Sequence, residues 1–332
     1  MTRILLLIMI ISCFTCHSLE AQEKATPKNG EGIELFLKRF GRNGANYRKE
    51  FIRLNKGKFG KNNSLKLGVK YTLPPLQKKT AAPEAKNKTK KRHEPLFGPN
   101  YASYQIVSNE LQGACFYLVS GHGGPDPGAI GRVGKHELHE DEYAYDVTLR
   151  IARNLLMRGA KVHIIIQDAK DGIRDQLYLS NSKRETCMGN HIPLNQVSRL
   201  KQRCDRINSL ARREQIKYKR ALFIHVDSRS KSKQTDVFFY HTGSRQSRKL
   251  ASTMKSTFQK KYNHHQPGRG FKGTVSSRDL YVLRNTDPVS VFIEIGNIQN
   301  KYDQQRITIS NNRQALANWI SEAFVEDYKN SK

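Results

Sequence analysis

The sequence predicts an α/β protein whose central sheet is covered by helices on both faces, with a small unit of two helices and a strand ahead of it. The main observation is an alternation, from about residue 96 onward, of short apolar runs with segments that carry apolar residues at helical spacing. Such an alternation is typical of a sheet that is buried on both sides. With 332 residues, of which 37% are hydrophobic, the chain is long enough for one large domain and a smaller one.

The chain begins with the features of a secretory signal, which we predict over residues 1–21. Arg3 precedes an apolar run over residues 4–11, and small and polar residues follow. The run is too short to span a membrane as a helix, and we expect no transmembrane helix elsewhere in the sequence. We therefore expect an exported protein of the periplasm or cell envelope, or an extracellular one, with cleavage after Ala21. A lipid anchor on Cys13, at the end of IISC, is the alternative.

A small unit is predicted over residues 28–75. Apolar residues at helical spacing predict two short helices, one around Phe36 and one around Phe51, and LKLGVKYTLP predicts a turn and a short strand. The stretches GEGIELFLKRFG, RLNK and LKLGVKYTLP resemble those of a LysM module, a small βααβ fold. This resemblance implies that the unit binds the N-acetylglucosamine-containing glycan of cell walls.

Residues 76–95 are predicted to form a basic, flexible linker. They contain almost no apolar residues, so they cannot bury enough surface to offset the entropy lost on ordering. The whole chain has 58 Lys and Arg against 29 Asp and Glu, a net charge of +29, which favours polyanionic partners. Because the protein is predicted to be exported, we expect an anionic envelope as its surroundings and no nucleic acid as its partner.

Residues 96–330 are predicted to form the large domain. Four apolar runs predict buried strands: CFYLVSG, KVHIII, ALFIHV and VFIEIGN. Two segments, YAYDVTLRIARNLLMRG and SRLKQRCDRINSLARR, carry apolar residues at helical spacing, and Gly159 ends the first. Residues 168–195 are predicted to be an additional loop.

Polar side chains lie at the ends of three of these strands. His122 follows the first within VSGHGGPDPGAIG, whose glycines leave room for a ligand; His225 ends the third, and Glu294 lies late in the fourth. Functional residues gather at the C-terminal ends of strands in such sheets, so we expect these three to meet. Two histidines and a carboxylate are donors of hydrolytic zinc, and a further carboxylate must transfer protons. The apolar neighbours of Glu294 suit it to that transfer. Asp126 is expected to orient His122 or its loop.

Residues 115–328 resemble the zinc-dependent N-acetylmuramoyl-L-alanine amidases of the Amidase_3 family. The resemblance is carried by five blocks in the family's order: GHGGPDPGAIG, DVTLRIARNLLMRGAKV, LKQRCDRIN, ALFIHVDS and LYVLRNTDPVSVFIEIGNIQN. It implies a mixed central sheet and one zinc ion held by His122, His225 and a glutamate between them, with Glu294 as the catalytic acid and base. The implied reaction is hydrolysis of the amide between N-acetylmuramic acid and L-alanine in peptidoglycan, which makes residues 96–330 the catalytic domain. Arg203 and Asn208 match family positions that are structural.

The identity of the glutamate ligand is left open by the sequence. The family has its glutamate at the position that is Ala144 here. Glu140 lies one helical turn before Ala144 on the same helix face, which favours Glu140. Glu142 is nearer in sequence, and a helix that begins at Glu142 with Asp141 as its cap would allow either side chain to reach the metal. Glu140 and Glu142 are therefore both candidate ligands.

Three cysteines lie beyond the predicted signal: Cys115, Cys187 and Cys204. Their odd number and wide separation exclude a disulfide-dense scaffold. An oxidising compartment permits one bridge, for which Cys187 and Cys204 are the candidate pair.

Two other functions compete with the amidase. One is a protein that docks on peptidoglycan without cutting it, or that cuts only with an activator protein; the presence of Glu294 with both histidines argues against an inactive site. The other is a zinc hydrolase of a different amide, such as one at a peptide C-terminus. Sites of that kind use an arginine to pair the terminal carboxylate, and the sequence alone places no such arginine.

Overall fold

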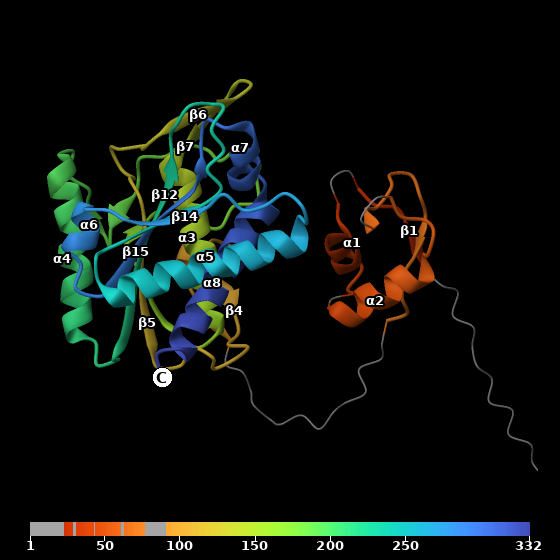
Figure 1. The fold of residues 1–332 in the computed structure, drawn as a ribbon, viewed down its shortest axis with the longest axis horizontal. Helices are drawn as coiled ribbons and strands as arrows, with labels where there is room; N and C mark the ends of the chain where they lie inside the picture. The colour runs from red at the N-terminus through yellow and green to blue at the C-terminus, as the bar shows by residue number, and fades with distance from the viewer. Residues whose placement is uncertain (1–22, 29–30, 43, 61–62, 77–90) are drawn as a thin grey trace, which may run out of the picture. The chain divides into compact units, whose positions relative to one another are not determined.

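The computed structural model divides the chain into two compact units, Met1–Asn87 and Lys88–Lys332 (Figure 1). It describes residues 23–28, 31–42, 44–60, 63–76 and 91–332. The predicted signal, residues 1–21, and residues 77–90 of the predicted linker lie outside the described residues.

The smaller unit has four elements in βααβ order: β1 (Lys24–Ala25), α1 (Ile33–Arg39), α2 (Ala45–Leu54) and β2 (Tyr71–Thr72). The two strands pair antiparallel. Phe36, Phe51 and Tyr71 are fully buried between the helices and β2, and their ring centroids lie 5.5–6.0 Å apart. Asn55, which follows α2, donates to the carbonyl of Thr72 and accepts from its N–H, both at 2.8 Å. The elements therefore follow the order that the sequence predicts, around a small aromatic core.

The larger unit is built on a six-stranded mixed sheet with the strand order β14–β13–β15–β12–β5–β8. Neighbouring strands from β15 to β8 are parallel, whereas β13 runs antiparallel to β15 and parallel to β14. This confirms the predicted α/β fold with a mixed central sheet. The strands are β5 (Ala114–Ser120), β8 (Lys161–Ile164), β12 (Tyr218–Asp227), β13 (Phe238–His241), β14 (Thr274–Ser277) and β15 (Val289–Asn297).

Helices cover both faces of this sheet (Figure 1). Side chains alternate between the faces along each strand, so Phe116 and Tyr117 of β5 belong to different apolar cores. The core that contains Phe116 is closed by α3 (Glu140–Met157), α5 (Arg245–His265) and α8 (Ser310–Lys329). The core that contains Tyr117 is closed by α4 (Gln196–Arg213) and α6 (Tyr281–Arg284). A further helix, α7 (Lys301–Thr308), packs against β15.

Shorter elements complete the larger unit. β3 pairs with β4, β6 with β7, and β10 with both β9 and β11. The predicted loop over residues 168–195 thus contains two of these strands, and the predicted linker residues 92 and 93 form another. Their bounds are β3 (Arg92–His93), 3-10 helix η2 (Pro95–Phe97), β4 (Ser103–Tyr104), β6 (Ile130–Val133), β7 (His136–His139), β9 (Ile166–Gln167), β10 (Thr186–Cys187) and β11 (Asn190–His191). Every helix that the structure describes is too short or too polar to cross a lipid bilayer.

The expected bridge between Cys187 and Cys204 is wrong, because both cysteines are free and buried. They belong to the same apolar core. The thiol of Cys204, however, is directed from α4 toward α6, where its Sγ lies 4.0 Å from the carbonyl oxygen of Val282 and 3.7 Å from Oγ1 of Thr286. Burial raises the pKa of both thiols.

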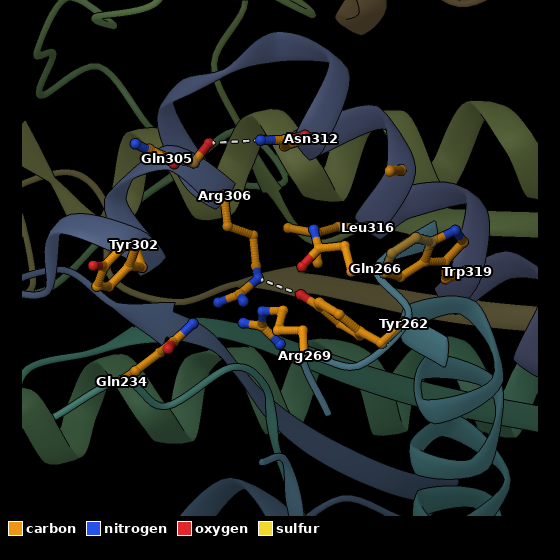
Figure 2. Close-up of a pocket in the computed structure, with 11 residues that line it drawn as sticks. Gln234, Tyr262, Gln266, Arg269, Tyr302, Gln305, Arg306, Asn312, Leu316 and Trp319 are labelled. Atoms are coloured by element: carbon orange, nitrogen blue, oxygen red, sulfur yellow. Dashed lines mark hydrogen bonds between the residues drawn. The ribbon is translucent and has the colours of Figure 1, made fainter. Parts of the chain in front are cut away.

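A buried ion-pair network joins the loop before β13 to α7. Asp236 is fully buried and accepts hydrogen bonds from Arg306 Nη2 at 2.8 Å and from Arg269 Nη1 at 3.2 Å. Burial acts to raise the pKa of Asp236, but the hydrogen bond from Arg269 and the charge of Arg306 outweigh burial and lower it. Figure 2 shows Arg306 directed at Tyr262, whose hydroxyl accepts from its Nε at 2.8 Å. A cavity of about 330 Å³ opens beside this network, and no predicted site residue lines it.

Candidate active site

The loop after β5 holds His122 in the left-handed backbone region, with a φ of 62°. Helix α4 fixes this loop through two guanidinium groups. Arg203 donates to the carbonyl oxygen of His122, and Arg199 donates to Oδ2 of Asp126 at 2.7 Å. The same oxygen of Asp126 lies 2.8 Å from Nδ1 of His122, so the predicted contact between Asp126 and the histidine is present.

The structure brings His122, Glu140 and His225 together. Oε1 of Glu140 lies 3.3 Å from Nε2 of His122 and 2.9 Å from Nδ1 of His225. The two imidazole rings are nearly perpendicular, at 78°, with centroids 4.9 Å apart. One nitrogen of each ring and one oxygen of Glu140 all lie within 4.8 Å of one another. Three separate segments, the loop after β5, the start of α3 and strand β12, therefore converge on one point.

Glu140 owes its position to being the first residue of α3, with His139 as the N-cap. Its Oε2 accepts from the N–H of Ala129 at 2.8 Å, and its Oε1 accepts from the N–H of Val226 at 2.9 Å. Burial acts to raise the pKa of Glu140, but the hydrogen bonds with the two histidines outweigh burial and lower it, so the carboxylate stays ionised. Because α3 begins at Glu140, the alternative of a helix that begins at Glu142 is wrong.

Glu142 is placed elsewhere. Two residues further along a helix, its side chain points about 200° around the axis from that of Glu140. Oε2 of Glu142 lies 2.9 Å from Nη1 of Arg174, and its carboxylate belongs to a separate buried acidic group with Asp141 and Glu185. The fold therefore brings Glu140, and not Glu142, to the two histidines.

Two glycines of VSGHGGPDPGAIG permit this close packing. A Cβ atom on Gly121 would overlap the imidazole ring of His225. Gly128 has a φ of +69°, and a Cβ atom there would lie 2.7 Å from both Oε2 of Glu140 and Cδ2 of His122. These glycines clear space for the site's own side chains, where the sequence predicts space for a ligand.

Glu294 lies on β15 directly beside His225 of β12 in the parallel register. Its Oε2 atom is buried and has no hydrogen-bond partner among the residues that the structure describes. Burial raises the pKa of Glu294 well above its usual range, and the charges of Glu140 and Asp227 raise it further. Such a carboxyl group can hold a proton at a pH where an exposed glutamate has lost it.

The converging side chains fit a divalent metal ion. Two imidazole nitrogens and one carboxylate oxygen are a donor set of zinc in hydrolytic sites. Burial lowers the pKa of His225 and keeps its ring neutral, as ligation requires. Burial also acts to lower the pKa of His122, but its hydrogen bonds with Asp126 and Glu140 outweigh burial and raise it to about 10. The cluster therefore attracts positive charge, and Asp126 contacts the ring nitrogen of His122 that faces away from Glu140, as carboxylates do behind ligand histidines.

Sequence reasoning missed the arginine that holds Asp126. Arg199 and Arg203 are four residues apart on α4, and this spacing places both on one face of a helix. That spacing could have indicated that the two arginines act together, although only the fold shows that they contact the loop of His122. Asn208, predicted to be structural, donates to the carbonyl of Asn285 at 2.9 Å and so ties α4 to the end of α6.

The comparisons with known sequences agree on one family. The family model described as N-acetylmuramoyl-L-alanine amidase matches residues 117–326. The probable cell wall amidase LytH of Staphylococcus aureus is 28% identical over 223 residues, which cover 65% of this chain and 59% of LytH. The chain thus spans less than two thirds of the length of this curated relative.

Solved structures of amidases are also similar to this chain. The catalytic domain of CwlV, an N-acetylmuramoyl-L-alanine amidase from Bacillus (Paenibacillus) polymyxa, has a TM-score of 0.47 at 19% identity and covers 66% of this chain and 99% of that one. The CwlD amidase of Clostridioides difficile, solved in complex with the GerS lipoprotein, has a TM-score of 0.48 at 16% identity and covers 65% and 98%. The family match takes in well over half of the 332 residues, including the three converging side chains and Glu294. The chain belongs to the Amidase_3 family of N-acetylmuramoyl-L-alanine amidases.

Proposed function

We propose that this protein is a zinc-dependent amidase that hydrolyses the amide between N-acetylmuramic acid and L-alanine in peptidoglycan. The observation that carries the proposal is the convergence of His122, Glu140 and His225 beside Glu294, a carboxyl group with an unused buried oxygen. Membership of the family supports the class of reaction and of substrate.

Each side chain has a distinct task in this reaction. His122, Glu140 and His225 would hold the zinc ion through two imidazole nitrogens and one carboxylate oxygen. When bound there, zinc supplies Lewis acidity and lowers the pKa of water to about 7. Glu294 accepts a proton from the water as its oxygen forms a C–O bond with the amide carbon. It then delivers this proton to the amide nitrogen, and the C–N bond breaks. Its raised pKa suits it to hold the proton between the two transfers, and Asp126 keeps the ring of His122 in place.

The remaining parts of the chain fit an enzyme that works on the cell wall. We propose residues 1–21 as an export signal, residues 28–75 together with strand β1 as a LysM-like module that binds glycan, residues 76–90 as a linker and residues 91–330 as the catalytic domain. The βααβ order of the small unit and the name of the cell wall relative support this assignment. A tethered domain meets nearby substrate at raised effective concentration. Dependence on an activator protein and lipidation of Cys13 stay predictions.

Purified peptidoglycan tests the proposal directly. The protein without its signal, loaded with zinc, is incubated with this substrate with and without a chelator, and the products are identified by mass. We expect release of stem peptides with a free L-alanine amine, and loss of that release when the chelator removes the metal. Binding to the wall without release, despite bound zinc, would favour a binding protein. Release of residues from peptide C-termini would favour a hydrolase of another amide.

A further inference from the structure

An aromatic surface extends along the sheet from Glu294. Phe238 and Tyr240 of β13 lie opposite Glu294 and Phe292 of β15 in the antiparallel register. Residues directly opposite in such a pair share one face, so the three rings lie on the same face as the Glu294 carboxyl group. The ring centroid of Tyr240 is 6.3 Å from that of Phe238 and 6.1 Å from that of Phe292. We call these three rings the aromatic floor.

Two arginines lie over the aromatic floor, and they differ in whether a carboxylate pairs with their charge. The guanidinium carbon of Arg229 lies 5.1 Å from the centre of the Phe238 ring, and that of Arg278 lies 4.7 Å from the centre of the Tyr240 ring. Arg229 is neutralised by Asp227, whose Oδ2 contacts its Nε. Arg278 takes part in no ion pair within the described part of the chain, and its neighbour Asp279 is paired with Arg284 instead.

The position of Arg278 relates it to the reacting centre. It follows directly after β14, and its N–H donates to the carbonyl of His241 at 3.2 Å. Its side chain is exposed, and the Tyr240 ring beneath it lies opposite Phe292, two residues before Glu294 on β15. One guanidinium without a counter-charge among the described residues therefore lies over the same part of the sheet as Glu294.

The contact with Tyr240 prepares Arg278 to bind an anion. Its guanidinium lies over the Tyr240 ring and hydrogen-bonds with the Tyr240 side chain, and its remaining N–H groups can donate to a carboxylate. The ring also restricts the side chain, so that less conformational entropy is lost when an anion binds. A single unpaired guanidinium matches a single negative charge.

We propose that Arg278, on the aromatic floor, forms a subsite for a free carboxylate on the stem peptide of the substrate. This inference rests on the proposed amidase function, because the stem peptide is the part of peptidoglycan that carries carboxylates next to the amide to be cut. The subsite makes the protein selective for stems with free carboxylates over stems in which these groups are amidated.

Two matched muropeptides test the subsite, one with free stem carboxylates and one with the same groups converted to carboxamides. We expect the wild-type protein to cleave the carboxylate form with a kcat/KM about tenfold to a hundredfold higher, the range for a charge-assisted hydrogen bond. Arg278→Gln is expected to bring this ratio close to one. Arg278→Lys keeps the charge and loses the two-pronged geometry, so an intermediate ratio is expected.

Arg284→Gln is the matched control, since Arg284 is an exposed arginine on the neighbouring helix α6 whose partner is Asp279. It is expected to leave the ratio at the wild-type value. Equal cleavage of both muropeptides by the wild type would overturn the subsite and leave the amidase proposal standing. An equal loss on both muropeptides in Arg278→Gln would also overturn it, because Arg278 would then position the site and not recognise the carboxylate.

Cleavage of neither muropeptide by the wild type would overturn the amidase proposal instead. The subsite is then tested by calorimetric binding of the same two muropeptides to the wild type and to Arg278→Gln. A preference for the carboxylate form that disappears in Arg278→Gln would support the subsite. Equal binding of the two forms would overturn it.

Discussion

Two buried groups of charged side chains in the larger unit differ in how completely their charges are paired. In the network around Asp236, each carboxylate oxygen accepts hydrogen bonds from its surroundings: Oδ1 from Arg306 and Gln234, and Oδ2 from Arg269 and the N–H of Lys272. In the cluster around Glu140, the neighbouring Glu294 keeps a buried oxygen for which the described part of the chain offers no partner. Both groups contact the same strand region, since Asp303, which binds Arg306, also accepts from the N–H of Asn297 at 3.0 Å.

This difference in pairing distinguishes a group that stabilises the fold from one that can take part in a reaction. A buried polar atom without a partner costs about 1–3 kcal/mol of stability. The described residues contain others, such as the Tyr117 hydroxyl, but the one on Glu294 lies beside His225. A fully paired network has no such unused capacity, and its role is to hold elements together. The comparison predicts that substitutions in the two groups change different observables.

The largest effect is expected for Glu294→Gln. Removing the group proposed to transfer protons should lower kcat by roughly 10²–10⁴, while zinc content stays the same. The free energy of unfolding should not fall, because no hydrogen bond to Glu294 Oε2 is lost. Rates of stem-peptide release and urea unfolding curves measure the two quantities.

Glu142→Gln is the contrasting variant, because Glu142 is a buried glutamate with a partner, Arg174. It should lower stability, since the buried guanidinium of Arg174 loses one of its two carboxylate partners and keeps only Asp171. The comparison fails if Glu294→Gln is less stable than the wild type by as much as Glu142→Gln, or if it keeps more than a tenth of the activity.

The next effect is expected for Asp236→Asn, which leaves Arg269 and Arg306 without their shared counter-charge. Breaking a buried pair in this way costs about 3–5 kcal/mol of unfolding free energy. Zinc affinity below the unfolding temperature should not change, because no residue of the network belongs to the cluster around Glu140. Asp279→Asn, at an exposed carboxylate paired with Arg284, should change stability by less than about 0.5 kcal/mol.

The pH dependence of the stability difference between the wild type and Asp236→Asn is a second test of this ion pair. The pKa of Asp236 is lower in the folded protein than in the unfolded chain. The stabilisation from its ionised form is therefore complete above the unfolded value of about 3.9 and is lost as the pH falls toward the folded value. The difference in unfolding free energy between wild type and Asp236→Asn should be constant near neutral pH and shrink in acid. A difference that grows in acid would contradict the assignment.

A smaller effect is expected for Asp126→Asn. The amide keeps the shape but weakens the hold on Nδ1 of His122, so zinc affinity should fall about 10–100-fold. Competition with a chromophoric chelator measures this change. Asp205→Asn removes an exposed carboxylate from an ion pair with Lys201 on α4 and should leave zinc affinity unaltered. Equal affinities for wild type and Asp126→Asn would show that the contact does not support the ligand.

Much of the central sheet could be predicted because parallel strands covered on both faces are continuous apolar runs. That pattern located β5, β12 and β15, and hence the histidines and Glu294 near their ends. Helix α5 was not predicted, although Leu250, Met254, Phe258 and Tyr262 recur every fourth residue and are all buried. Strands β13 and β14 have four residues each, which is too short for a clear pattern.

The details of the site depended on contacts between distant segments. The choice between Glu140 and Glu142 required the true start of α3 and the donors on Ala129 and Val226, which the fold alone brings near. The place of Arg278 follows from the alignment of β14 with β13 and is invisible in local sequence. Side-chain types and spacings therefore identified the chemistry, whereas tertiary contacts selected among equal candidates.

The alignment of β12 with β15 also determines the stage of folding at which the site is complete. His225 and Glu294 are neighbours in one register only, and a slip of one residue would turn a side chain to the opposite layer. Pairing of strands far apart in the chain is a slow event in folding, because a long loop must first close. During refolding, activity should therefore return at the rate at which the sheet is completed, and not at the faster rate of the earlier collapse. In an unfolded chain His225 and Glu294 are not neighbours, so we expect such a chain to be inactive.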